Sequence, residues 1–308
     1  MKIATAAVLR AAFIFGLISL GSVAQAGAFS DPPTEQEIFR AHLFEEPLVP
    51  IGGHASADEN RALADALTTY AERTSNDDVT AVTGFLQAHP QSPWRVSLLT
   101  DLGIVYYRTA HFSKCVATWQ AAWDAGKGEN DPQARLLVDR AVGELAKMEG
   151  RLGQIETIAA LLQDVATRNV RGPGETLLTH ARQELALMQQ KPEVAFRCGP
   201  LAVDRIRAFK NPKVQTAPQI LASASTINGT SLAYVASLAH GVGLDYQMAK
   251  RENDSEPPTP CVVHWKVGHT TLPCLRSPTG AIMHRIPRSE MKSGLALKPL
   301  PRNRTAIS

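Results

Sequence analysis

One cysteine in this 308-residue chain stands where a thiol can act as a nucleophile. Cys198 is followed by Gly-Pro, and proline favours the first turn of a helix because the N–H that it lacks is not needed there. A helix N-terminus stabilises the thiolate, which is the attacking form of cysteine. Such a nucleophile needs a histidine base from elsewhere in the chain. Taken alone, Cys-Gly-Pro is a weak signal that favours a structural cysteine over a nucleophile.

A second helix and a strand follow this segment. Residues 225–232 read Ser-Thr-Ile-Asn-Gly-Thr-Ser-Leu, and Thr230 or Ser231 can cap the helix that comes next. After a polar, proline-rich loop, the alternation over 261–269 predicts a strand. The residues that share one face of that strand are Cys261, Val263, Trp265, Val267 and His269.

This order of motifs resembles the bacteriocin-processing, double-glycine cysteine peptidases, a papain-like family. The matching parts are Cys198-Gly199 at a helix start, the segment 229–232 at the next helix start, and the strand that ends in Gly268-His269. The resemblance implies an α+β papain-like domain over 191–269. It also implies that Cys198 is the nucleophile and His269 the general base of peptide hydrolysis through a thioester acyl-enzyme.

Two positions depart from the family pattern. The family has a glutamine for the oxyanion hole six residues before the cysteine, where this chain has Pro192; Gln190 is the candidate substitute. The family also has an Asp-Pro pair after the histidine to orient the imidazole, and no Asp follows His269. The sequence therefore leaves open an alternative in which a degenerate domain binds a peptide or protein without cutting it.

Ahead of this segment, apolar residues recur at helical spacing from 56 to 190, after a lead segment at 27–55. The clearest helix pair carries Gly103 and Tyr106 on its first helix and Trp119 on its second, an arrangement that resembles the tetratricopeptide repeat. We predict a mainly α helical-repeat array, followed by the α+β domain. Such an array is a scaffold or recognition arm on which a protein partner can bind.

The N-terminus reads as a secretory signal peptide over 1–26. Lys2 and Arg10 supply positive charge before an apolar stretch at 11–20. Ala-Gln-Ala at 24–26 fits the small-x-small cleavage pattern. That stretch is shorter than the roughly 20 residues that span a bilayer. We therefore expect cleavage, a periplasmic or secreted location, and no stable membrane insertion afterwards.

The overall charge and composition exclude several classes. The chain is 44% hydrophobic and 20% charged, which indicates a folded protein, and its formal net charge is +3. Seven Lys/Arg and a single acidic residue lie in the tail at 270–308, so the rest of the chain is acidic and gives no reason to expect a nucleic-acid partner. No phosphate-binding glycine loop and no metal-ligand spacing occur, and we expect neither a cofactor nor a metal.

The tail at 270–308 differs from everything before it, and we predict that it is irregular. Reading the gene two bases further along from Thr270 can give Tyr-Ala-Ala-Leu-Leu and then, further on, an Asn-Gly hairpin turn and an Asp-Pro pair. These are the family features that the chain lacks after His269. We therefore predict that the tail is a frameshift product and that the peptidase domain is incomplete at its C-terminus.

The nucleotide sequence from codon 270 onward tests this prediction. We expect its synonymous codon choices to permit the alternative reading along the whole run, because the shifted codons share two bases with the present ones. Codons that cannot encode the Asp-Pro pair in the shifted frame would contradict it.

Overall fold

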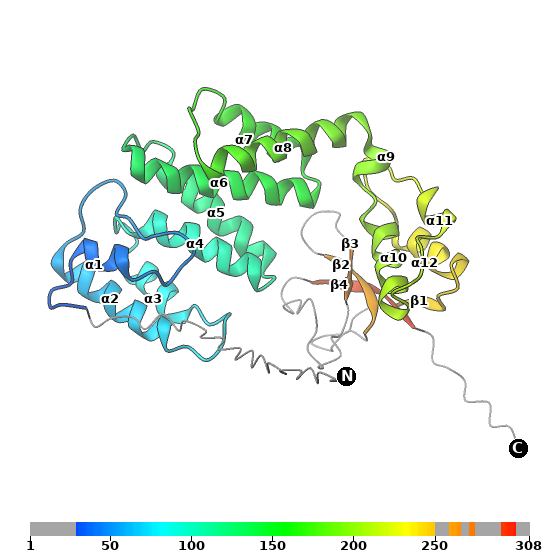
Figure 1. Ribbon diagram of the computed structural model, residues 1–308, viewed down its shortest axis with the longest axis horizontal. Helices are drawn as coiled ribbons and strands as arrows, with labels where there is room; N and C mark the ends of the chain where they lie inside the picture. Colours follow the sequence, from blue (N-terminus) through cyan, green and yellow to red (C-terminus); the bar gives the residue numbers. More distant parts are fainter. Residues whose placement is uncertain (1–28, 250–258, 266–270, 275–290, 300–308) are drawn as a thin grey trace, which may run out of the picture.

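The computed structural model describes residues 29–249, 259–265, 271–274 and 291–299, and this part of the chain is mainly helical (Figure 1). The predicted helical region is thereby confirmed, whereas the predicted signal peptide lies outside the described residues. The helices are α1 (Glu35–Arg40), α2 (Ala57–Ala71), α3 (Thr80–Ala88), α4 (Arg95–Arg108), α5 (Phe112–Gly126), α6 (Pro132–Leu152), α7 (Ile155–Asp164), α8 (Pro173–Gln190), α9 (Pro192–Ala195), α10 (Cys198–Lys210), α11 (Pro218–Leu221) and α12 (Leu232–Gly241). Within the described residues, no helix combines the length and the apolar character needed to cross a membrane.

Local sequence signals fix the ends of these helices. Ser56 caps α2 in a capping box with Glu59, at the residue where the helical region is predicted to begin. Asp131 accepts hydrogen bonds from the first turn of α6, and Gly153 ends that helix with a left-handed φ of 73°. Consecutive helices then pack against one another as pairs, with α2 on α3, α4 on α5 and α6 on α7.

The contact between α4 and α5 is the closest of these pairings. A Cβ at Gly103 would lie 2.6 Å from Cε2 of Trp119, so only glycine allows the indole to lie against the α4 backbone. The Trp119 Nε1 donates a hydrogen bond to the carbonyl of Thr100 at 3.0 Å. The Trp119 side chain is therefore buried with its polar atom hydrogen-bonded.

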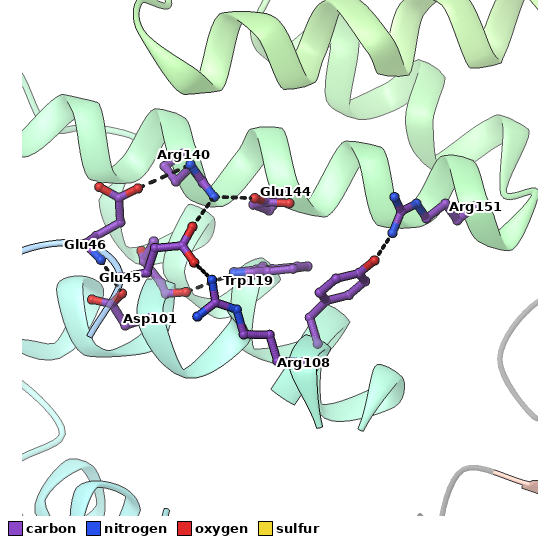
Figure 2. A network of polar contacts seen from close by, with 10 residues as sticks. Glu45, Glu46, Asp101, Arg108, Trp119, Arg140, Glu144 and Arg151 are labelled. Atoms are coloured by element: carbon purple, nitrogen blue, oxygen red, sulfur yellow. Dashed lines mark hydrogen bonds and ion pairs between the residues drawn. The ribbon is translucent and has the colours of Figure 1, made fainter. Parts of the chain in front are cut away.

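The lead segment crosses α4 and α6 rather than projecting away from them (Figure 2). The backbone N–H of Glu46 donates to Asp101 Oδ1 of α4 at 3.0 Å. Arg140 of α6 contacts Glu45 at 2.9 Å, Glu46 at 3.3 Å and Glu144 at 2.7 Å. Since Arg140 is largely buried among three carboxylates, it joins the lead segment to the helical array.

Two hydrophobic clusters divide the molecule. The first runs from Ile38 to Phe196 and includes the buried tryptophans Trp94, Trp119 and Trp123. The second runs from Ala202 to Val262 and joins α10, α11 and α12 to a sheet. Figure 1 shows the two parts at opposite ends of the molecule, connected through α9.

The sheet is antiparallel in the order β1-β4-β2-β3. Its strands are β1 (Tyr246–Ala249), β2 (Cys261–Trp265), β3 (Thr271–Cys274) and β4 (Met291–Pro299). The prediction that the whole tail is irregular is therefore wrong at 271–274 and 291–299. The backbone groups of β2 need partners on both sides, and these two segments supply them. The frameshift prediction concerns the gene and stays a prediction.

We expect Gly103→Ala to lower the free energy of unfolding by about 1–3 kcal/mol, because the new methyl group overlaps the Trp119 ring. Urea unfolding measures the change. Gly84→Ala is the matched control, since Gly84 lies in α3 with no atom within 4 Å of a Cβ; there alanine should stabilise by about 0.5–1 kcal/mol. Equal effects of the two substitutions would contradict the close contact.

Candidate active site

Cys198 is the first residue of α10, as the Gly-Pro sequence after it predicts. The start of this helix is held in place by Arg197, whose guanidinium donates to the carbonyl oxygens of Ile220 and Leu221 and to Ser223 Oγ. The thiol is half-buried, in contrast to the fully buried Cys115 and Cys261. A nucleophile has to be reachable by its substrate, and among these three cysteines Cys198 alone meets that condition.

Gly199 brings the two predicted motifs together. A Cβ at this position would lie 2.6 Å from Val235 Cγ2 of α12, and it would lie closer still to Thr230 Oγ1. The Cys-Gly and Gly-Thr-Ser-Leu segments are therefore in direct contact, although about thirty residues separate them in the sequence. Of the two predicted caps, Ser231 is the one that caps α12, accepting a hydrogen bond from the backbone N–H of Tyr234 at 3.2 Å.

The sheet supports α10 and α12 from one side. α10 contacts β2 and β3, and α12 contacts β1 and β4. Val262 of β2 belongs to the second cluster, and its neighbours Cys261 and Val263 are buried as well. Because both faces of β2 are covered at these residues, alternation along this strand does not separate buried from exposed side chains.

Of the other two predicted site residues, the structure describes only Gln190, and it does not bring Gln190 to Cys198. His269 lies outside the described residues, beyond the end of β2 at Trp265. Gln190 is the last residue of α8 and is exposed, and Pro192 begins the short helix α9. Gln190 is also absent from the wall of the cavity that contains Cys198.

That cavity has a volume of about 250 Å³, and most of its wall comes from the helical array. α6 and the residue after it contribute one side, α8 contributes another, and the segment that leads into α10 closes it. The lining residues are Gly150, Arg151, Leu152, Gly153, Glu184, Leu187, Met188, Ala195, Phe196 and Cys198. Sequence reasoning missed the part played by α6 and α8, and the only local signal was the Gly-x-x-Gly spacing of Gly150 and Gly153.

Two charged side chains, Glu184 and Arg151, stand in this otherwise apolar wall. Glu184 Oε2 is buried and has no hydrogen-bond partner among the described residues. Burial raises the pKa of Glu184, and the nearby Arg151, His180 and Lys147 oppose the shift. The cavity therefore offers a substrate an apolar surface, one carboxyl group that gains protons readily and one guanidinium.

Across the described ranges, no three side chains of His, Cys, Asp and Glu come together in a way that could hold a metal ion.

Comparisons with known proteins add no relative: no protein-family model, no curated protein and no solved structure matches this chain.

We expect Glu184→Gln to weaken the pH dependence of stability. Because the folded-state pKa of Glu184 is raised, folding favours the protonated carboxyl. The free energy of unfolding therefore falls as the pH rises from 4.5, the ordinary pKa of a glutamate, through the raised pKa of the folded state. The amide cannot ionise, so this fall should shrink. Urea unfolding from weakly acidic to neutral pH measures it, with the exposed Glu193→Gln as the control. Parallel stability curves for wild type and Glu184→Gln would contradict this assignment.

Proposed function

We propose that this chain is an exported cysteine peptidase of the bacteriocin-processing, papain-like type, acting on a peptide or protein substrate. The observation that carries the proposal is the position of Cys198, which lies at the N-terminus of α10 and lines a cavity. The contact of Gly199 with the start of α12 gives it further support, since the resemblance places these two motifs in one site.

The chemistry follows from these positions. His269 takes the proton of the Cys198 thiol, the thiolate attacks the scissile carbonyl, and His269 passes that proton to the leaving amine. Water then hydrolyses the thioester, which releases the acid and restores the thiol. The first N–H groups of a helix have no partner within it, and the amides of Cys198 and Gly199 stand at that place in α10. They are the candidate donors to the oxyanion, in place of the glutamine that the chain lacks.

The helical array contributes to substrate choice in this proposal. We assign it to the tetratricopeptide type, because its helices pack as consecutive pairs and glycine permits the α4–α5 contact. α6 and α8 form much of the wall around Cys198, so residues of the array contact whatever occupies the cavity. A protein partner bound elsewhere on the array would be held close to the same site.

A second candidate function is non-catalytic binding by the same domain. The observation that favours it is the position of Gln190, which is exposed and does not line the Cys198 cavity. With Pro192 in the place of the family's glutamine and no Asp after His269, the domain would grip a peptide in the cavity and leave it intact.

Thiol labelling and peptide hydrolysis separate the two functions. We expect a thiol-directed active-site probe to label Cys198, and a mixed peptide library to be cleaved by the wild type but not by Cys198→Ala. His269→Ala should lower both labelling and cleavage by about three orders of magnitude, because the base is lost. Mass spectrometry measures both quantities.

His240→Ala is the matched control, since His240 has a largely exposed side chain at the end of α12. Labelling of Cys198 that persists undiminished in His269→Ala argues against an activated nucleophile. Peptides that bind the wild type without being cleaved would establish the second function instead.

A further inference from the structure

A larger cavity lies in the helical array, away from Cys198. Its volume is about 480 Å³, within the range of small-molecule sites. The lead segment covers one side of it through Leu43, Phe44 and Glu45. The rest is formed by the end of α2, by Arg73 and Asn76 in the connection after α2, and by α4 from Asp101 onward. It shares no residue with the Cys198 cavity, so ligand binding there does not depend on the proposed peptidase function.

Asp101 brings an unused polar atom to the wall of this cavity. Its side chain is almost completely buried, with the residue 1% exposed. Oδ1 accepts the hydrogen bond from the Glu46 N–H, but Oδ2 is buried without a partner among the described residues. A buried polar atom left unpaired lowers the stability of the folded protein by about 1–3 kcal/mol, and a ligand that hydrogen-bonds to this atom removes that penalty.

Arg73 offers a second unused group in the same wall. Its guanidinium lies over the Tyr70 ring at 3.7 Å, and Nη1 donates to the Tyr70 carbonyl at 2.7 Å. Nε is buried, and it too has no partner among the described residues. Tyr70 and Phe44 stack at 4.9 Å, and both rings line the cavity together with Arg73 and Asp101.

The charges around the cavity favour an anion. Burial raises the pKa of Asp101 well above its ordinary value, with Glu45 and Glu46 adding to the shift and Arg140 opposing it. The raised pKa favours the protonated form of Asp101, which donates through its hydroxyl group and carries no charge. Arg73 and Arg108 line the cavity with one further carboxylate, Glu45, which is paired with Arg108 and Arg140.

We propose that this cavity binds a carboxylate carried on an apolar or aromatic body, with Arg73 Nε–H and the Asp101 side chain holding the carboxylate. Phe44, Tyr70, Ile104 and Val105 supply the apolar surface for the body. The same chemistry occurs in free aryl or alkyl carboxylic acids and at the C-terminus of a peptide that ends in an apolar residue.

Calorimetric titration of the purified full chain tests the proposal. The first probe pair is phenylbutyrate and its uncharged amide, and the second is a short peptide ending in Phe, with a free or an amidated C-terminus. We expect at least one of the two acids to bind at least about tenfold more tightly than its amide, because charge-assisted hydrogen bonds are lost with the charge. Binding of the small acid alone identifies free acids as the ligand, and binding of the peptide acid identifies a C-terminus.

Two variants locate the site. Arg73→Gln should weaken binding of the acid at least about tenfold, while the exposed Arg171→Gln in the connection before α8 should leave it unchanged. The wild type by itself can overturn the proposal, whether or not Arg73→Gln folds. It does so if acid and amide bind with equal affinity, or if neither acid binds. Unchanged affinity in a folded Arg73→Gln overturns it as well.

Discussion

The contact between Gly103 and Trp119 is the constraint on which the rest of the helical array depends. It sets α4 and α5 close enough for the indole N–H to reach the Thr100 carbonyl, so the Trp119 side chain is buried with its polar atom satisfied. α6 then packs on both helices, and α8 packs on α6. Arg140 on α6 in turn holds the lead segment across them.

A glycine also permits a close contact between helices in the second half of the molecule. Gly199 lets α10 meet the start of α12, and this single small residue joins two motifs that are distant in the sequence. The position of Cys198 is fixed by that contact on one side and by Arg197 on the other, which ties the helix start to the α11 segment. The nucleophile candidate is thus placed by the packing and hydrogen bonds of the residues on either side of it.

Prediction from the sequence succeeded where a signal is local. Helical periodicity gave the array, and the Gly-Pro after Cys198 gave the start of α10, because both depend only on neighbouring residues. The strand β4 was missed even though Leu295 and Leu297 alternate with small or charged residues, because proline and basic residues are frequent throughout the tail. The wall that α6 and α8 contribute around Cys198 depends on how two distant segments pack, and periodicity carries no such information.

The Cys198 cavity borders both halves of the molecule, and this has a mechanical consequence. Its walls come from α6 and α8 of the first hydrophobic cluster, while the thiol sits on the first helix of the second. Within the described part of the chain, α9 and its flanking residues link the two. A rotation of one half against the other would therefore widen or narrow the cavity, so the angle between the halves sets how much room surrounds the sulfur.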